Sequence, residues 1–148
     1  MARNYNQGRY TLNNPEKCIN GTNDIRYLSS YELECWKWAD NNENVIRWGA
    51  ETVVVPYYSS VKGRKSRYIV DMYIEYIDKK GNKRKALCEI KPFIYTKKPK
   101  DSNKKKKETL MQEQLTWVTN NEKWQAAKKY AEDRGWEFRI LTEKQIFG

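Results

Sequence analysis

The sequence predicts a single α/β domain, in which a central mixed β-sheet is flanked by helices. Segments with helical spacing of apolar residues alternate with short runs of β-branched and aromatic residues, in the order helix, several strands, helix, strand. The chain has 148 residues, the size of one ordinary domain, and it contains no internal repeat. Its 6 Trp, 11 Tyr and 3 Phe supply side chains for a core.

The N-terminal segment is expected to differ from the rest. Residues 1–27 are polar, rich in Asn, Arg and Gly, and have no sustained apolar period. We therefore expect them to form a flexible arm that orders on binding. The folded domain is expected to span residues 28–148.

A helix is predicted to start at Ser29-Ser30-Tyr31-Glu32, a Ser-x-x-Glu capping box, and to end at Asn41-Asn42. Trp36 and Trp38 cannot both face the core from such a helix, so one of them is expected to be partly exposed. The core-facing side is predicted from apolar residues at helical spacing: Leu28, Tyr31, Cys35, Trp38 and Ala39.

Several strands are predicted after this helix. Residues 45–48 and 52–55 are short β-rich runs, and Pro56 is expected to end the second. Residues 67–77 are predicted to form a longer strand, which the Lys80-Gly81-Asn82 turn connects to a returning strand. That strand, residues 85–91, alternates apolar side chains on one face: Ala86, Cys88 and Ile90.

The C-terminal part is predicted to contain a helix, a strand and a last helical turn. A lysine-rich linker over residues 96–107 leads into a helix over residues 108–134, either continuous or broken at Asn120-Asn121. Gly135 suits the end of that helix. Residues 136–141 are predicted to form the strand, and the turn of helix follows it.

The charge of the chain favours a polyanionic partner. Its 29 Lys and Arg exceed its 19 Asp and Glu, giving a formal charge of +10, which attracts nucleic acid. A solvated basic surface is the alternative. Because the chain has no histidine, Ser-His-Asp hydrolases, histidine-metal nucleases and zinc deaminases are excluded. Any chemistry must use carboxylates and lysines, with or without a bound metal.

The cysteines and the apolar segments restrict the class of protein further. Cys18, Cys35 and Cys88 are far apart and odd in number, which argues against a disulfide framework and a zinc site. The N-terminus lacks an apolar signal stretch, and no segment is long enough to span a membrane. We therefore expect a soluble, intracellular protein.

Both strands of the predicted hairpin carry an acid within apolar sequence. Asp71 lies in the first strand, and Glu89-Ile90-Lys91 lies in the second. The other acidic-x-Lys triplet, Asp78-Lys79-Lys80, lies in the polar turn, where its charges are solvated. Unpaired charges in apolar strands are costly, so the acids in the strands point to a function.

This pattern suits metal-assisted hydrolysis of a phosphodiester. Asp71 and Glu89 would hold a hard cation such as Mg²⁺, and Lys91 would orient a water and offset charge. The i, i+2 spacing directs Glu89 and Lys91 to one face of the strand. A structural salt bridge between Asp71 and Lys91 remains an equal alternative. Glu32 could reach the same point from the helix, although the capping box explains it without a catalytic role.

Basic residues flank the candidate acids on both sides along the sequence. We expect them to contact DNA phosphates without reading base sequence. For the downstream lysine run, a disordered solvated loop is the alternative. The expected contacts are Lys62, Arg64, Lys65 and Arg67 upstream, and Lys97 and Lys98 downstream.

A succession of motifs covers nearly the whole chain beyond residue 26: residues 27–32, 48–52, 55–57, Arg67-Tyr68 with Asp71, residues 89–92, 123–127, Gly135 and residues 138–142. In this order they resemble the head completion nucleases of tailed bacteriophages. That family belongs to the PD-(D/E)XK nuclease superfamily and is related to the endonuclease subunit of heteromeric transposases. The ordered succession is far more specific than any single motif.

The resemblance implies a restriction-endonuclease-like core that binds Mg²⁺, with Mn²⁺ as a substitute. The metal is expected at Asp71 and Glu89, with Lys91 as the catalytic lysine. Glu32 is expected to be a helix-borne acid that completes the metal shell, a role compatible with capping. In this way the resemblance changes the interpretation of Glu32 from a cap to a catalytic residue.

The resemblance also implies a biological role. Double-stranded DNA would be the substrate, trimmed as phage heads are finished after packaging, in the host cytoplasm or on the virion, with portal or head–tail connector proteins as partners. The family often has a basic residue where this chain has Leu28, so Arg26 is expected to make that phosphate contact. A structural head completion protein that binds DNA or the portal without cutting is the alternative. A repair or recombination nuclease of the same fold is a weaker one.

Overall fold

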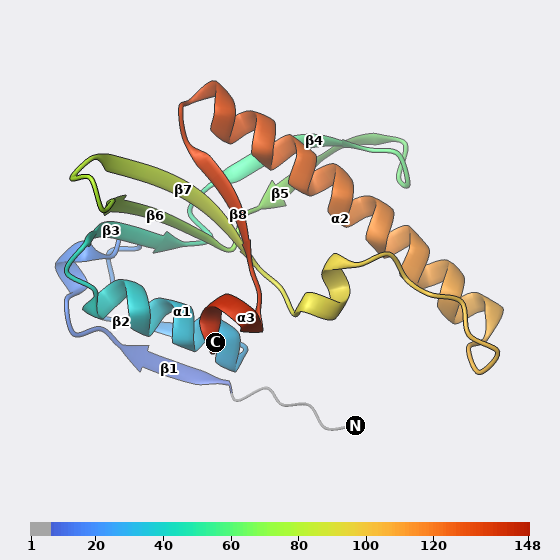
Figure 1. The fold of residues 1–148 in the computed structure, drawn as a ribbon, viewed down its shortest axis with the longest axis horizontal. Coiled ribbons are helices and arrows are strands. Elements are labelled where there is room, and N and C mark those ends of the chain that lie inside the picture. Colours follow the sequence, from blue (N-terminus) through green and yellow to red (C-terminus); the bar gives the residue numbers. More distant parts are fainter. Residues whose placement is uncertain (1–6) are drawn as a thin grey trace.

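The computed structural model describes residues 7–148, which fold around one central sheet (Figure 1). Its elements include two short 3₁₀ helices, labelled η. In chain order they are β1 (Gly8–Thr11), η1 (Pro15–Lys17), β2 (Asp24–Tyr27), α1 (Ser30–Asn41), β3 (Val45–Ala50), β4 (Val54–Ser59), β5 (Arg64–Ile69), β6 (Met72–Ile77), β7 (Lys83–Ile90), η2 (Phe93–Thr96), α2 (Lys107–Asp133), β8 (Glu137–Leu141) and α3 (Glu143–Ile146).

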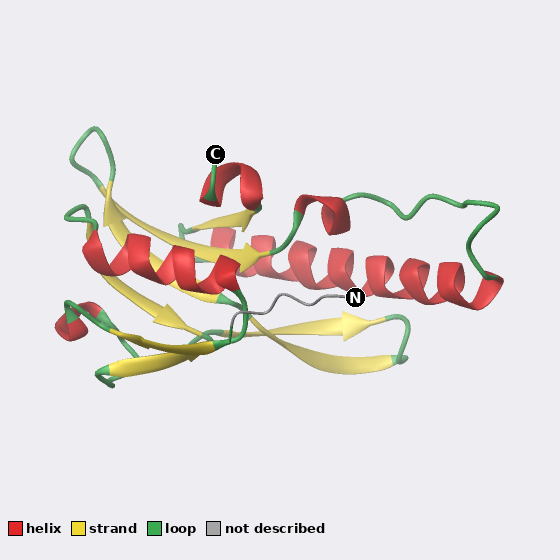
Figure 2. Ribbon diagram, turned by 90° about the horizontal axis from the view of Figure 1, so that it is seen from below, coloured by secondary structure: helices red, strands yellow, loops and turns green. Residues whose placement is uncertain are grey.

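The central sheet has four strands in the order β3-β6-β7-β8. β3, β6 and β7 are antiparallel neighbours, whereas β8 runs parallel to β7, so the sheet is mixed. Helix α1 packs on one face of the sheet and α2 crosses the other (Figures 1 and 2). The predicted fold class is therefore confirmed.

The hairpin of β6 and β7 supplies both faces of the core. Met72 pairs with Cys88, and both lie in the buried cluster beneath α1. Tyr73 pairs with Leu87, and both lie in the cluster beneath α2. Successive side chains of a strand point to opposite faces, so this register confirms the predicted alternation.

As expected, one of the two tryptophans of α1 is buried and the other is partly exposed. The exposed one, however, is Trp38, which was predicted to face the core. Trp36 is 3% exposed and stacks on Trp48, with ring centroids 6.2 Å apart. Trp38 is 50% exposed. The prediction that Trp38 faces the core was wrong because the buried stripe runs through Cys35, Trp36 and Ala39, which leaves Trp38 on the outer side.

The N-terminal segment is ordered over residues 7–27, in contrast to the predicted flexible arm. β1 and β2 form an antiparallel pair, and η1 lies between them. Leu12 and Cys18 are each 6% exposed and belong to the core beneath α1. A few buried side chains and backbone pairing therefore order a segment whose composition is polar. The remainder of the predicted arm, residues 1–6, lies outside the described residues.

The predicted strand over residues 67–77 is divided between two sheets. β5 pairs with β4 in a separate two-stranded ribbon, and the chain leaves this ribbon at Val70 and Asp71 to enter β6. Pro56 lies inside β4 and does not end it. Both strands of a two-stranded ribbon are edges, where a residue without an N–H group is tolerated.

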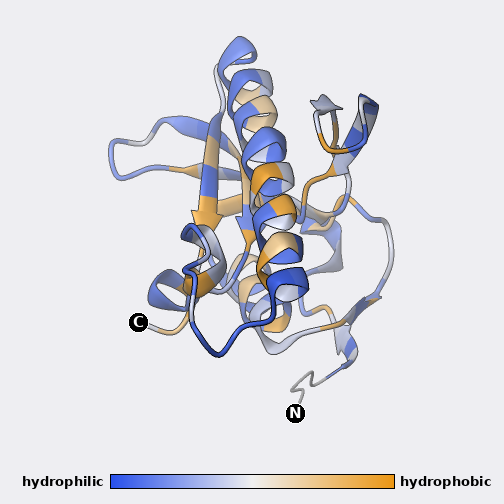
Figure 3. Ribbon diagram, turned by 90° about the vertical axis from the view of Figure 1, so that its right-hand side faces the viewer, coloured by the Kyte–Doolittle hydropathy of each residue, from blue (hydrophilic) through white to orange (hydrophobic). Residues whose placement is uncertain are grey.

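The C-terminal elements follow the prediction closely. α2 is continuous across Asn120-Asn121, and Gly135 follows it with a φ of 74°, a left-handed conformation that suits glycine. Thr142 caps α3 through a capping box. The hydrophobic residues gather on the strands and on single turns of α2 (Figure 3). Within residues 7–148, none of the helices combines the length and apolar character needed to cross a bilayer.

Candidate active site

Asp71 and Glu89 lie at the same end of the β6–β7 hairpin. The pairing of Met72 with Cys88 brings the residues that flank this pair, Asp71 and Glu89, close to each other. Asp71 is held by its neighbour strand, since its Oδ2 atom accepts a hydrogen bond from the Ile90 N–H at 2.8 Å. The break between β5 and β6 thus places one acid where the next strand can fix it.

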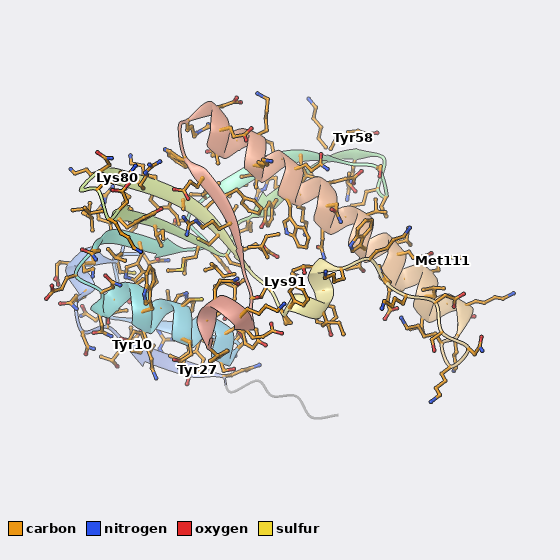
Figure 4. The ribbon with its side chains drawn as sticks, viewed as in Figure 1. Tyr10, Tyr27, Tyr58, Lys80, Lys91 and Met111 are labelled. Carbon is orange, nitrogen blue, oxygen red and sulfur yellow. The ribbon has the colours of Figure 1, made fainter. Side chains whose placement is uncertain are left out.

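Both carboxylate oxygens of Glu89 have partners. Glu89 is 6% exposed, and the hydroxyl of Tyr68 donates to its Oε1 atom at 2.5 Å. Lys91 Nζ lies 3.4 Å from Oε2, and Figure 4 places Lys91 where β7 leads into η2. The predicted alternative of an Asp71–Lys91 salt bridge does not occur, because Lys91 pairs with Glu89.

The electrostatics of the two acids, Asp71 and Glu89, favour a positive charge beside them. Burial raises the pKa of the Asp71 carboxyl well above its usual range, and the neighbouring Glu89 raises it further. The Ile90 N–H group opposes this rise, whereas Glu32 adds to it at longer range. Two carboxylates in this arrangement form a donor set that suits a hard divalent cation.

Ser29 caps α1, and the Glu32 carboxylate binds the chain just before this cap. Its Oε1 atom accepts from the Leu28 N–H at 2.7 Å, and Ser29 Oγ accepts from the Glu32 N–H at 3.2 Å. Among residues 7–148, no group of three or more acidic, cysteine or histidine side chains is close enough to share a metal ion. Glu32 is therefore not gathered with Asp71 and Glu89, and it influences Asp71 through its charge.

The predicted DNA contacts lie on three different parts of the fold. Within residues 7–148, the side chains of six of the seven form no ion pair or hydrogen bond, so their charges remain available to an anion. Arg26 lies on β2, where its guanidinium donates to Gln7 Oε1 at 3.3 Å. The six are Lys62, Arg64, Lys65 and Arg67 on the β4–β5 ribbon and Lys97 and Lys98 after η2, all exposed.

Tyr68 is a site residue that the sequence interpretation missed. It is 4% exposed and belongs to β5, so its hydrogen bond to Glu89 joins the basic β4–β5 ribbon to the central sheet. Lys123 of α2 lies over its ring, with Nζ 5.7 Å from the centroid. The available signal was its place in the Arg67-Tyr68 motif, three positions before Asp71, but its partner depends on the break after β5.

Comparison with known proteins agrees with this architecture. A profile of the TnsA-like endonuclease N-terminal domain matches residues 42–143. The chain belongs to the TnsA-like endonuclease family. One relative of this TnsA-like chain is the head completion nuclease of Enterobacteria phage T4, which is 37% identical over 139 residues, covering 92% of this chain and 90% of the relative.

The matched range shows which part of the TnsA-like chain has the sequence features of the family. It contains Asp71, Glu89 and Lys91 together with the whole central sheet, and it leaves out Glu32. The resemblance inferred from the motifs is confirmed, as is the restriction-endonuclease-like arrangement of a mixed sheet between helices. This TnsA-like chain thus combines a nuclease-family core with an N-terminal segment that packs against it.

Proposed function

We propose that this protein is a Mg²⁺-dependent endonuclease that cuts double-stranded DNA during the completion of phage heads, after DNA packaging. One observation carries the proposal: Asp71, Glu89 and Lys91 come together at one end of the β6–β7 hairpin, and Tyr68 fixes Glu89. A protein that only bound DNA would gain nothing from two acids beside the phosphates, because they repel the backbone.

The donor set fits a magnesium ion. Mg²⁺ keeps several waters and is commonly bound through one or two carboxylates, so Asp71 and Glu89 suffice as protein ligands. Mn²⁺ accepts the same oxygen ligands and should substitute. When bound there, the ion would polarise a phosphate oxygen and lower the pKa of a bound water. Glu32 is proposed to act on the outer side of this site, through water and charge, while it also binds the Leu28 N–H before α1.

The side chains of this protein have separate roles in the proposed reaction. Asp71 is held by the Ile90 N–H, which leaves its Oδ1 atom for a ligand. Glu89 is oriented by the Tyr68 hydroxyl. Lys91, 27% exposed at its side chain, would leave Glu89 to orient the attacking water and offset the charge that develops on the phosphate.

The basic residues support binding to DNA without sequence readout. The β4–β5 ribbon presents Lys62, Arg64, Lys65 and Arg67, and it is joined to the site through Tyr68. Lysine and arginine contacts to phosphates position a duplex but do not specify its sequence. Arg26, Lys97 and Lys98 are proposed as further phosphate contacts.

The relative in phage T4 supports a place in head completion, in the host cytoplasm or on the virion. Portal or connector proteins are the proposed docking partners. Trimming DNA that protrudes from a filled head is a task that a nuclease without sequence preference can perform. The alternative is a head completion protein that binds DNA or the portal without cutting.

Purified protein incubated with supercoiled and linear DNA tests the proposal. We expect nicked or linear products with Mg²⁺ or Mn²⁺ and none with EDTA. Agarose gels resolve these products directly. DNA binding without cleavage in either metal, on both substrates, would favour the structural alternative.

Tyr68→Phe is expected to weaken metal-dependent cleavage without unfolding the protein. The substitution removes one hydroxyl, so Glu89 loses the donor that orients it. Partners of metal ligands typically contribute about 10- to 100-fold in metal affinity or activity, so we expect a shift of about ten-fold in the Mg²⁺ concentration for half-maximal rate. The measurement is a Mg²⁺ titration of the initial cleavage rate.

Tyr57→Phe is the matched control for Tyr68→Phe. Tyr57 is 7% exposed and lies in the same core cluster, but its side chain takes part in no hydrogen bond among the described residues. Tyr57→Phe should therefore leave the Mg²⁺ concentration for half-maximal rate unchanged. An equal shift in both variants would show that Tyr68 acts through packing and not through its hydrogen bond to Glu89.

A further inference from the structure

A cavity of about 860 Å³ lies beside the candidate active site. It is lined by η2, the chain that follows it and the N-terminal half of α2, which extends beyond the central sheet (Figures 1 and 4). Lys91 is one of its lining residues, so the cavity opens onto the proposed catalytic lysine. Its volume lies within the range of ligand-binding pockets.

The lining combines aromatic rings with positive charge. Phe93, Tyr95 and Trp117 contribute rings, and five lysines line the cavity against two glutamates. One of these glutamates, Glu113, is neutralised by Lys105 at 2.7 Å. Gln112 adds an amide group that can pair with a polar edge. The surface therefore suits a ligand with a flat apolar face, polar edges and negative charge.

Exposure of one ring, that of Tyr95, supports binding of such a ligand, whereas Phe93 and Trp117 are half-buried. Tyr95 is 60% exposed, and its neighbour Ile94 is 70% exposed. Lys97 Nζ lies 4.9 Å from the centroid of the Phe93 ring, which keeps a cation beside the aromatic surface. A combination of aromatic rings and lysines is the arrangement by which proteins bind single-stranded nucleic acid, with bases on the rings and phosphates on the cations.

We propose that this cavity binds an unpaired nucleotide of the DNA strand that is cut at Lys91. This inference rests on the proposed function and specifies its substrate. A base within a duplex is stacked on both faces and paired at its edge, so it cannot enter the cavity. An unpaired base can stack on Tyr95 or Trp117 while its phosphates contact Lys97 and Lys98. The enzyme therefore favours DNA ends with a single-stranded extension over blunt ends.

Binding is tested separately from cutting. The wild-type protein is mixed in EDTA with a duplex whose short single-stranded extension contains the fluorescent base 2-aminopurine, and with a blunt duplex that carries the same base in a pair. We expect quenching of the unpaired base on binding, and about ten-fold tighter binding of the extended duplex, in line with the contribution of one stacked base.

Tyr95→Ala is the test variant, and Tyr58→Ala is its matched control. Both tyrosines are 60% exposed, but Tyr58 lies on the β4–β5 ribbon (Figure 4). Tyr95→Ala should remove most of the quenching and the preference for the extended duplex, whereas Tyr58→Ala should retain both. Because Tyr95 is exposed, its loss does not disturb the core.

The outcomes separate this inference from the proposed function. Quenching by a protein that cuts no DNA in any metal would overturn the nuclease proposal and leave the nucleotide cavity supported. Metal-dependent cutting without quenching, and with equal affinity for blunt and extended ends, would overturn the cavity proposal alone. Retained preference in Tyr95→Ala would likewise overturn it.

Discussion

Asp71→Asn and Lys91→Ala are each expected to lower metal-dependent DNA cleavage by about 10²- to 10³-fold, the usual effect of removing a charge-stabilising group from an active site. Asp71 supplies the carboxylate that the Ile90 N–H fixes at the end of the hairpin. Lys91 supplies the cation that lies 3.4 Å from Glu89. The measurement is the initial rate of plasmid nicking at saturating Mg²⁺.

Lys80→Ala is the matched control for Lys91→Ala. Lys80 belongs to the other acidic-x-Lys triplet of the chain, Asp78-Lys79-Lys80, at the opposite end of the same hairpin (Figure 4). It is exposed in the turn, and its loss should leave the rate unchanged. Wild-type rates in Asp71→Asn, with unaltered folding by circular dichroism, would contradict the proposed site.

The control also separates two explanations of a slow Lys91 variant. If the lysine contributed only general attraction to DNA, Lys80→Ala would slow cleavage to a similar degree, and raising the DNA concentration would restore both rates. If Lys91 acts on the reacting phosphate, only Lys91→Ala is slow, and the deficit persists at saturating DNA.

The parts of the site that the sequence could predict are those joined by local structure. A turn at Lys80-Gly81-Asn82 determines how β6 and β7 pair, and this register brings Asp71 and Glu89 together. Their acidic side chains were noticeable because they interrupt apolar strands. The hairpin needed no long-range information, so its prediction was reliable.

The parts that the sequence could not predict depend on contacts between distant segments. The break at Val70 and Asp71 occurs because β5 pairs with β4, a separate ribbon that packs against α2. Neither the periodicity of the apolar residues nor their β-strand propensity distinguishes two strands with this break from one long strand. The same break places the Tyr68 hydroxyl against Glu89. A sequence interpretation that lacks the break therefore cannot predict this hydrogen bond.

The polar N-terminal segment was mispredicted for a related reason. Composition favours disorder where few apolar side chains are available, but here two buried side chains, Leu12 and Cys18, join a core built by the rest of the chain. A buried carboxylate in α1 adds polar contacts that no periodicity reveals. That carboxylate, Asp40, is the basis of the second prediction.

Asp40 anchors the N-terminal segment to α1. It is 0% exposed, and its carboxylate accepts hydrogen bonds from the Tyr10 hydroxyl at 2.6 Å and from the N–H groups of Asn13 and Asn14 at 2.7 and 2.9 Å. Lys17 Nζ donates to the Asp40 carbonyl oxygen at 3.1 Å. These contacts join residues 10–17 to the helix that precedes the central sheet.

Asp40→Asn is expected to lower the free energy of unfolding at pH 7 by about 2–3 kcal/mol, because the amide nitrogen cannot accept the bonds that one carboxylate oxygen accepts and leaves buried donors without partners. Urea denaturation measures the loss. Asp101→Asn is the control, since Asp101 is exposed in the lysine-rich linker. Equal stability of Asp40→Asn and wild type at pH 7 would show that the anchor contributes nothing.

The pH dependence gives the same prediction a second, independent test. Burial alone would raise the pKa of Asp40, but the hydrogen bonds from Tyr10, Asn13 and Asn14 outweigh it and hold the pKa below its usual value. A carboxyl with a lowered folded-state pKa stabilises the protein above its unfolded pKa of about 3.9, and this contribution is lost as the pH falls through the folded value. The stability difference between wild type and Asp40→Asn should therefore be constant near neutrality and shrink in acid. A difference that stays constant into strong acid would mean that the charge on Asp40 is not what anchors the segment.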